Sequence, residues 1–474
     1  MRTPCHTARG VLLLLVVVAL GLGGVAPGFA QDDAAEAPNP FGPDSSSVRK
    51  HFGRAMGETF AVNLMVWAYD RYIRPVPEGT KQGEGFRISF NSWKENIKNG
   101  MEFDDNNFAT NQFAHPYHGS LYFNAGRSNG YDFWESSAFT WMGSFMWEYF
   151  GETHHPAVND WVSTSVGGTA MGEVLFRFSD MILDNTATGS NRTWRELGGA
   201  AVNPMRGFNR LVTGEAFRVH PNSPDRTPKN YYFALEGGLR TTGEEKIWEA
   251  DTTRAYVNFD WRYGNPFEGE YSKPFSSFDF MLQINFREKS AIGVAAAKGL
   301  LWGTHLHESE VTDNILTAYQ HYDYVENTAY EFGGQSFSLG FMTRIDSGTR
   351  FTTSATLHLN ALLLGAVKGD YANSSGRAYD YGPGVGYKFN IMVRRDDRDF
   401  LTFAHSAFLI HSINGNVSDH IVAVTRVKMD IPVRGFFGLG IDYWLYNRES
   451  TYRDFEDVSR RFPEIRGYFS YAVN

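Results

Sequence analysis

The chain has 474 residues, is 42% hydrophobic and 15% aromatic, and carries 44 Lys and Arg against 53 Asp and Glu, a net charge of −9. This acidic balance argues against nucleic acid as a partner, because such binding depends on basic side chains that neutralise phosphates. The single cysteine, Cys5, excludes an intramolecular disulfide and a metal site built from several thiolates. Stability must therefore come from packing and hydrogen bonds.

Residues 1–30 have the pattern of a cleaved export signal. Arg2 and Arg9 form a positive start, an apolar run follows from Val11 to Leu22, and Gly28-Phe29-Ala30 places small residues at the −3 and −1 positions. The run is short for a membrane-spanning helix, so we expect cleavage before Gln31. Residues 31–47 are rich in Ala, Pro, Asp and Ser, which predicts a disordered leader.

Residues 48–228 are predicted to form a helical domain. Apolar residues recur at helical spacing from Glu58 to Tyr72, a second helix is expected from Trp134 to Phe150 before Gly151, and a third from Pro156 to about Leu183. The stretch from Asn185 to Pro228 is expected to be mostly loop, with a short helix near Pro204–Leu211.

The third predicted helix contains small residues about four apart, which permit close approach of a neighbouring backbone. A free glycine in a helix costs roughly 1 kcal/mol against alanine. We expect tight packing against the Trp134 helix to compensate. These small residues are Ser163, Gly167, Gly168 and Gly172.

Residues 229–474 change to a period of two, which is typical of strands with one apolar and one polar face. In Ala255–Tyr263 the odd positions are apolar or aromatic and most even ones are polar, and the same alternation recurs in 278–287, 354–363, 385–394 and 437–445. About twelve such segments can be counted. Their length suits tilted strands crossing a hydrocarbon layer, where a sheet must close because lipid offers its edges no hydrogen bonds. The prediction is an antiparallel transmembrane β-barrel after an N-terminal helical unit, an α+β membrane protein. The alternative is a soluble sandwich or lipocalin-like barrel, whose apolar face points inward.

The polar residues between His115 and Asp180 are the candidates for chemistry. Acids among Trp, Phe and Met are costly unless they are paired or bound. One interpretation is structural: the acids cap helices and pair with Arg127 and Arg177, with Asp160 in a first helical turn near the positive end of the dipole. The other is an acid–base or metal group. The candidate catalytic residues are His115, His118, Glu148, Glu152, Asp160 and Glu173, and the candidate metal ligands are His115, His118, Glu148 and Glu152.

Sequence motifs for common cofactors do not occur. There is no Walker loop or dinucleotide fingerprint, and Gly382-Pro383-Gly384-Val385-Gly386 precedes a strand and is interpreted as a turn. We therefore expect no cofactor.

The stretch from Asn107 to Asp184, extending to Arg210, resembles the bacterial family known as domain of unknown function 3943. The motifs that carry the resemblance are His115-Pro116-Tyr117-His118-Gly119, Trp134-Glu135-Ser136-Ser137, Trp147-Glu148-Tyr149-Phe150-Gly151-Glu152, Asn159-Asp160 and Gly167-Gly168 through Gly172-Glu173. The resemblance implies kinship and assigns no activity.

Two functional hypotheses follow for this predicted outer-membrane protein. The first, which we favour, is a non-enzymatic envelope protein that binds or passes a lipid or small molecule. The second is an outer-membrane hydrolase or acyltransferase acting on lipid or lipopolysaccharide through His115, His118 and the helical carboxylates. Outer-membrane lipid is the expected partner, and the helical domain is expected in the periplasm or within the barrel.

Overall fold

The computed structural model describes residues 49–74, 83–247, 253–268, 271, 273–288, 290–327, 330–373 and 376–474. The predicted signal and leader lie outside these residues. The chain divides into two compact units, one holding the residues up to Asp104 with Ala114–Thr227, the other holding Asp105–Phe113 with Pro228–Asn474. We describe each unit by itself.

The first unit is helical. Its helices are α2 (Phe52–Tyr72), α3 (Phe90–Asn99), α4 (His115–Ser128), α5 (Phe133–Phe150), α6 (Val158–Val162), α7 (Gly168–Ile182), α8 (Gly189–Val202) and α9 (Pro204–Thr213), with 3-10 turns η1 (Glu84–Phe86), η4 (Glu215–Phe217) and η5 (Pro224–Arg226). Two π-helical turns, η2 (Thr110–Ala114) and η3 (Ser163–Gly167), directly precede α4 and α7. Among the described helices, none is both long and apolar enough to cross a membrane.

Local sequence explains where the longer helices begin and end. The Asp132 side chain accepts from the Glu135 amide while Glu135 accepts from the Asp132 amide, a capping box that starts α5. The Asn203 side chain caps α9 by accepting from the Arg206 amide, and Gly214 ends the helix in the left-handed region at φ 76°. Glu135 of the Trp-Glu-Ser-Ser motif is therefore a helix-capping residue.

The small residues of α7 and η3 do allow two backbones to touch, but the neighbouring helix is α4 and not the expected α5. A Cβ on Gly168 would lie 2.6 Å from Gly119 Cα, and one on Gly119 would lie 1.9 Å from the Thr164 carbonyl oxygen. Gly172 packs against the Phe123 ring in the same crossing. This contact places the start of α4 beside η3.

The expectation that Asn185–Pro228 is mostly loop was wrong. Residues 189–202 form α8, a helix the sequence pattern did not reveal because its first turns are polar and it contains Gly198 and Gly199. The structure gives the reason: Gly199 packs against the Leu183 side chain, so tertiary contact compensates for poor helix propensity. The predicted helix near Pro204–Leu211 is confirmed as α9.

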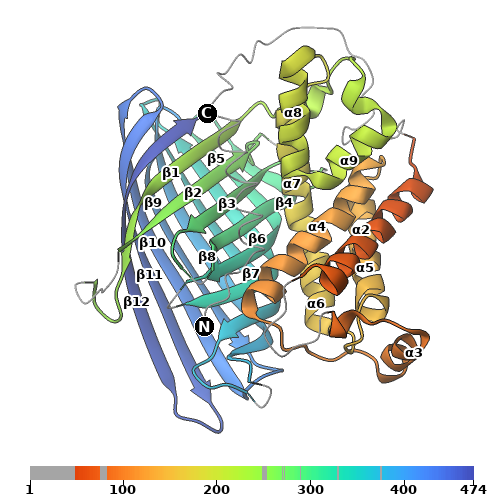
Figure 1. The fold of residues 1–474 in the computed structure, drawn as a ribbon. Coiled ribbons are helices and arrows are strands. Elements are labelled where there is room, and N and C mark those ends of the chain that lie inside the picture. The colour runs from red at the N-terminus through yellow and green to blue at the C-terminus, as the bar shows by residue number, and fades with distance from the viewer. Residues whose placement is uncertain are drawn as a thin grey trace. The chain divides into compact units, whose positions relative to one another are not determined.

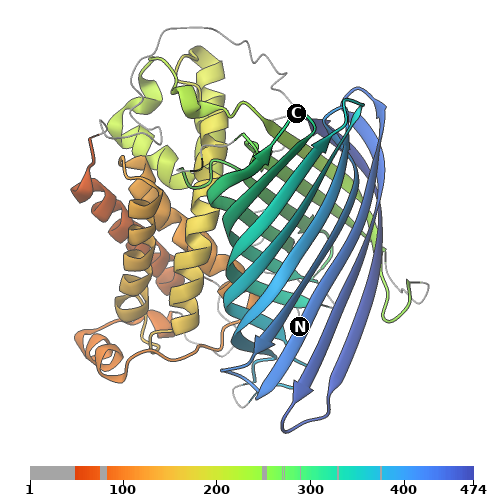
Figure 2. The same ribbon diagram turned by 180° about the vertical axis from the view of Figure 1, so that it is seen from behind.

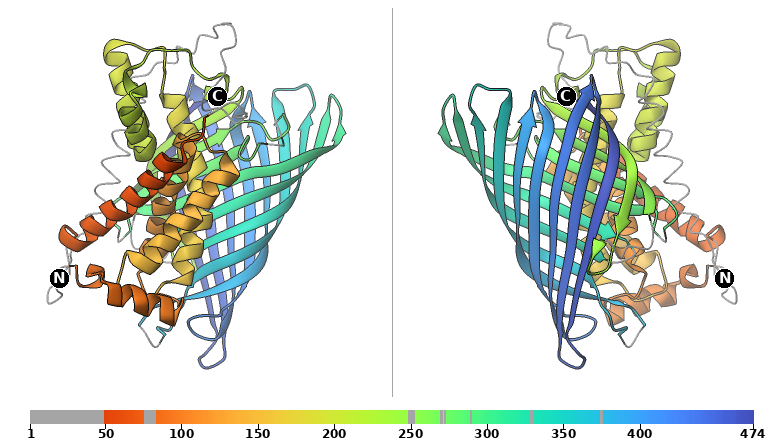
Figure 3. Two further views of the ribbon diagram at one scale, coloured as in Figure 1. Left: turned by 90° about the vertical axis from the view of Figure 1, so that its right-hand side faces the viewer. Right: turned by 90° about the vertical axis from the view of Figure 1, so that its left-hand side faces the viewer.

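The second unit is a closed antiparallel barrel, seen from two opposite sides in Figures 1 and 2. Twelve strands close in the order β1-β12-β11-β10-β9-β8-β7-β6-β5-β4-β3-β2, so each pairs with its sequence neighbour and β1 pairs with β12. They are β1 (Tyr231–Thr242), β2 (Thr253–Tyr263), β3 (Phe278–Asn285), β4 (Ile292–Glu308), β5 (Thr312–Glu326), β6 (Glu331–Asp346), β7 (Phe351–Lys368), β8 (Tyr379–Arg395), β9 (Arg398–His411), β10 (Ser418–Arg434), β11 (Phe437–Tyr452) and β12 (Val458–Val473). The strands tilt strongly in the quarter-turn views of Figure 3, as barrel closure requires.

The outer face of the barrel is apolar, as the alternation predicted. On β7, Leu357, Leu359 and Leu363 are exposed while His358 and Asn360 between them are buried. The same division holds on β11 and β12, where Leu439 and Phe469 are exposed and Asp442 and Ser470 buried. Exposed apolar side chains around a closed sheet are typical of a lipid-facing wall. The structure is an outer-membrane-type barrel and not a sandwich with an apolar interior.

A short segment from outside the strands, Asp105–Phe113, belongs to the barrel unit. Asn111 donates to the hydroxyls of Tyr379 and Tyr381, each at 3.1 Å, and the Tyr322 hydroxyl donates to the Gln112 carbonyl at 2.7 Å. Phe108 stacks on the Tyr324 ring with centroids 5.7 Å apart. Tyrosines of β5 and β8 therefore hold this segment within the barrel unit.

Candidate functional site

Three of the predicted site residues meet in the helical unit: His115 at the start of α4, Glu148 in the last turn of α5 and Asp160 in α6. One donor atom from each can be chosen so that all three lie within 4.8 Å of one another. Glu148 and Asp160 are buried, and the His115 side chain is 11% exposed. The group therefore combines an imidazole and two carboxylates in a largely water-free setting.

The orientation of His115 is fixed through both ring nitrogens. Nδ1 lies 3.2 Å from the Thr164 hydroxyl, and Nε2 lies 3.5 Å from Asp160 Oδ2. Thr164 belongs to the π-helical turn η3, and His115 directly follows the π-helical turn η2. Such turns occur often at functional sites, because an extra residue in a helix redirects side chains.

The two carboxylates have different environments. Glu148 Oε2 accepts from the Ala157 amide at 2.8 Å, while Oε1 is buried with no hydrogen-bond partner among the described residues. Asp160 Oδ1 accepts from the Asn159 side chain at 2.7 Å. Neither forms an ion pair with a lysine or arginine in the described part of the chain. A buried carboxylate oxygen without a partner is costly, so Glu148 Oε1 needs an explanation.

A further carboxylate, Asp104, approaches from the segment before α4. Its backbone amide donates to Asn159 Oδ1 at 3.0 Å, and its side chain accepts from the Asn159 amide group at 2.8 Å. The segment is held there by the pairing of Glu102 with Ala157, with hydrogen bonds of 2.8 Å on both sides. Asn159 therefore bridges Asp104 and Asp160.

Burial and mutual repulsion shift the ionisation of the whole group. Burial lowers the pKa of His115 to about 4, partly opposed by Asp104. Burial raises the pKa of Glu148, and the charge of Glu152 raises it further. The pKa of Asp160 is raised by burial and then by Asp104, Glu148 and Glu152. His115 is thus neutral near pH 7, the form in which imidazole binds metals.

The remaining predicted residues lie outside this group. His118 faces Tyr122, with Nε2 2.7 Å from its hydroxyl, and its ring contacts Trp147 edge-on. Burial lowers the pKa of His118 to about 3, with nearby His115 adding to the effect. Glu152, just past α5, has a pKa raised to about 8 by burial, then by Asp104 and Asp70.

Glu173 on α7 belongs to a separate ion-pair network. Arg127 binds it through two nitrogens at 2.8 and 3.0 Å, and Arg177 binds it at 2.8 Å. The guanidinium carbon of Arg127 also lies 4.5 Å from the centre of the Phe176 ring. Glu173 thus has the structural role that was weighed as the alternative for these acids, and the network joins α4 to α7.

Sequence reasoning missed Asp104 and Thr164. Asp104 lies in an irregular polar stretch, and Thr164 lies among other Ser and Thr residues, so spacing marks neither. Asn159-Asp160 was visible as a motif, and only the fold shows that Asn159 organises two carboxylates.

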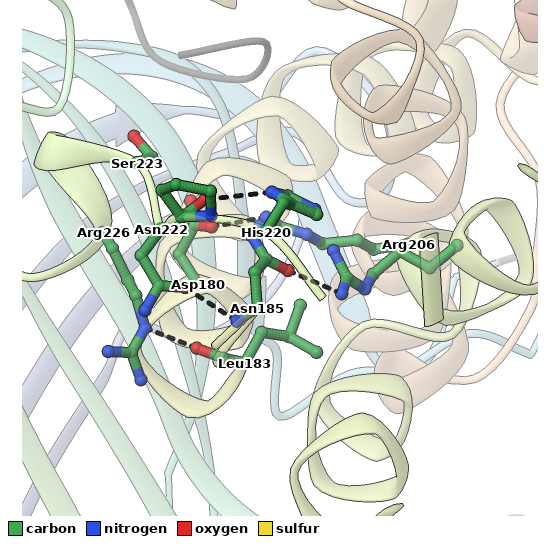
Figure 4. A pocket seen from close by; sticks show the side chains of 10 residues that line it. Asp180, Leu183, Asn185, Arg206, His220, Asn222, Ser223 and Arg226 are labelled. Atoms are coloured by element: carbon green, nitrogen blue, oxygen red, sulfur yellow. Dashed lines mark hydrogen bonds and ion pairs between the residues drawn. The ribbon is translucent and has the colours of Figure 1, made fainter. Parts of the chain in front are cut away.

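A polar hollow lies elsewhere in the helical unit (Figure 4). It is lined by Asp180, Asn185, Arg206, Arg210, His220, Asn222 and Arg226. Its arginines are engaged by the protein itself. Arg206 pairs with Asp180, Arg210 donates to Asn185 at 2.8 Å and pairs with Glu196 at 2.7 Å, and Arg226 donates to the Leu183 carbonyl. The hollow is therefore held together by its own charges.

The barrel interior is crossed by side chains. Arg262 of β2 donates to Asp399 of β9 at 2.7 Å and to the Met392 sulfur of β8 at 2.9 Å. In the ring of strands, β9 lies five places from β2 and β8 lies six, which is directly opposite. Arg426 of β10 reaches Met281 of β3 at 3.8 Å across a similar span.

Further interior charges are paired, and most of them are buried. Arg466 binds Glu464 at 2.6 Å and Gln283 at 2.7 Å, and its guanidinium lies 4.4 Å from the Trp444 ring. The other pairs are Lys428–Glu236, Arg426–Asp442, Arg398–Asp430, Arg240–Glu464 and Lys388–Asp323. These pairs add further charged side chains to the described interior.

Residues 100–205 match the family described as domain of unknown function (DUF3943). The resemblance drawn from the motifs between Asn107 and Asp184 is thereby confirmed, and all three residues of the buried group lie within the match. No curated protein matches the chain.

Among solved structures, the chain is similar to a NanC porin at 10% identity, covering 50% of this chain and 98% of the porin, with a TM-score of 0.28. It is also similar to OpdO of Pseudomonas aeruginosa, at 11% identity, covering 51% of this chain and 96% of OpdO, with a TM-score of 0.19. A further match is the CymD monoaromatic hydrocarbon channel, at 8% identity, covering 52% of this chain and 89% of the channel, with a TM-score of 0.21. At these identities and TM-scores the likeness carries no argument about activity.

Proposed function

We propose that the barrel of this outer-membrane protein is an anchor and not an open channel, so that a lipid or small-molecule ligand binds the helical unit and does not pass through the barrel. The observation that carries the proposal is the crossing of the barrel interior by Arg262 and Arg426, which reach strands on the far side. An open porin keeps its lumen lined by hydrated side chains. The apolar outer wall supports location in the outer membrane, and the helical unit is proposed to lie in the periplasm.

The test is sugar permeation in liposomes that contain the full-length protein. The wild type is expected to swell no faster in arabinose than protein-free liposomes. Removing the crossing side chains with Arg262→Ala and Arg426→Ala is expected to open the lumen and raise the rate. Arg350→Ala is the matched control, because it breaks an exposed Arg350–Asp396 pair of the barrel with side chains 66% and 49% exposed.

Two results would overturn the proposal. One is fast swelling with the wild type, which would make the barrel a channel. The other is equal swelling with the double variant and with Arg350→Ala when all proteins still show the gel shift on boiling that folded barrels give. In that case the crossing side chains do not close the lumen.

The second candidate is an enzyme acting on lipid or lipopolysaccharide, and the buried group around His115 favours it. A neutral histidine between a threonine hydroxyl and a carboxylate is oriented as a general base requires. His115→Gln and the isosteric Glu148→Gln should then change the lipid profile of the outer membrane in mass spectra, while exposed His155→Gln and Glu102→Gln leave it as in wild type. Unchanged spectra with folded site variants would exclude this candidate.

A further inference from the structure

We propose that His115, Glu148 and Asp160 bind one divalent transition-metal ion of the zinc, iron and manganese class. The proposal concerns the helical unit alone, so its test does not depend on whether the barrel conducts. The donor set is one imidazole and two carboxylates, a mixture that suits these ions better than calcium or magnesium, whose ligands are oxygens.

The geometry comes close to what such an ion requires. Two donors bound tetrahedrally at about 2.0–2.2 Å lie about 3.3–3.6 Å apart. His115 Nε2 and Asp160 Oδ2 are 3.5 Å apart, already at that spacing. All three donors lie within 4.8 Å of one another, so a small shift of a carboxylate is enough to close the group around an ion.

A second, independent observation is the unsatisfied oxygen of Glu148. The Ala157 amide fixes Oε2, which leaves Oε1 buried without a hydrogen-bond partner among the described residues. A cation shared with Asp160 and His115 would give that oxygen the partner it lacks. It would also balance the charge of two buried carboxylates that no described lysine or arginine pairs with.

The surroundings provide the outer contacts that metal ligands usually have. Thr164 contacts His115 Nδ1 and so leaves Nε2 facing Asp160, and Asn159 holds Asp160 and Asp104 together. Three protein donors leave at least one coordination position for water or substrate, with Asp104 and Glu152 as nearby carboxylates. Such an open position is typical of catalytic metal sites and not of structural ones.

The experiment uses full-length protein purified in detergent, stripped with a chelator and titrated with Zn²⁺ or Co²⁺ by calorimetry. We expect one ion per chain, visible d–d absorption with Co²⁺, and a higher unfolding temperature of the helical signal with metal. Mg²⁺ and Ca²⁺ are expected to bind at least 100-fold more weakly.

Variants that each remove one donor group locate the ion. His115→Gln, Glu148→Gln and Asp160→Asn should each weaken Zn²⁺ binding at least 100-fold. Thr164→Val, which keeps the ligands and removes the contact with Nδ1, should weaken it about 10–100-fold, with Thr164→Ser restoring it. The controls are His155→Gln and Glu102→Gln, an exposed pair 3.4 Å apart in the same unit that should bind as wild type.

The proposal is overturned if the stripped wild type takes up no stoichiometric Zn²⁺, or if the control variants lose as much affinity as the site variants. If Glu148→Gln fails to fold, the Thr164 pair decides, because Val and Ser differ in the hydroxyl while both keep a small side chain. Equal affinity of Thr164→Val and Thr164→Ser at wild-type level would also count against the assignment of His115 as ligand.

Discussion

The crossing of α4 with η3 and α7 yields the sharpest prediction, made with Gly119→Ala. Its new Cβ would lie 1.9 Å from the Thr164 carbonyl oxygen, a backbone atom that cannot move aside without moving η3. Overpacking of this kind costs typically about 1–3 kcal/mol, and the contact with backbone puts it at the upper end. Alanine recovers up to about 1 kcal/mol of helix propensity. Gly119→Ala should therefore lower the free energy of unfolding by about 2 kcal/mol.

Gly57→Ala in α2 is the matched control, because no atom lies within 4 Å of its added Cβ. Gly57→Ala should raise the free energy of unfolding by up to about 1 kcal/mol, so the two variants should shift the unfolding temperature in opposite directions. For a unit of this size, about 2 kcal/mol corresponds to a fall of roughly 4–8 °C in unfolding temperature.

The assay is thermal unfolding of the full chain in detergent, followed by circular dichroism at 222 nm, which reports the helices. Gly119→Ala should also weaken Zn²⁺ binding, because Thr164 and His115 move apart. An unfolding temperature at or above that of Gly57→Ala would refute the close backbone contact and with it the positioning of the site.

Two further predictions concern charge. Glu173→Gln leaves Arg127 and Arg177 without their buried carboxylate and should lower the free energy of unfolding in urea by about 3–5 kcal/mol. The control Glu135→Gln retains the helix cap and breaks only an exposed pair with Lys50, so it should lower that free energy by under about 1 kcal/mol. Equal losses for the two variants would contradict the buried network. In metal-free protein the raised pKa values of Glu148, Asp160 and, at about 8, Glu152 mean that the folded state holds protons the unfolded state has released, so the free energy of unfolding should fall as the pH rises. His115 and His118, with pKa values lowered to about 4 and about 3, act in the opposite sense near pH 6.5, where the unfolded imidazoles still bind protons. They add nothing above about pH 7.5, so the fall is to be measured between about pH 7.5 and 8.5. Glu152→Gln should reduce the slope there, and a free energy of unfolding that rises with pH in that interval would contradict the shifts.

Alternation in residues 229–474 was enough to predict an apolar outer wall, because each strand carries its own period-two pattern and needs no partner to show it. Caps were equally local: Gly151 and the Asp132–Glu135 box mark the ends of α5 within a few residues. The motifs around His115 and Glu148 also sufficed to indicate the family match. All of these are properties of short windows of sequence.

Only the tertiary structure decided which of the six candidate residues meet. His118 and Glu173 have the same residue types as the group they do not join, and spacing along the chain cannot separate them. The selection is made by the Gly119–Gly168 contact, which brings the start of α4 against η3, and by the pairing of Glu102 with Ala157, which adds Asp104. Helix α8 was missed for the same physical reason, since its stability comes from the packing of Gly199 on Leu183 and not from its own residues. Local pattern therefore fixed the kinds of element, and contacts between distant segments fixed the site.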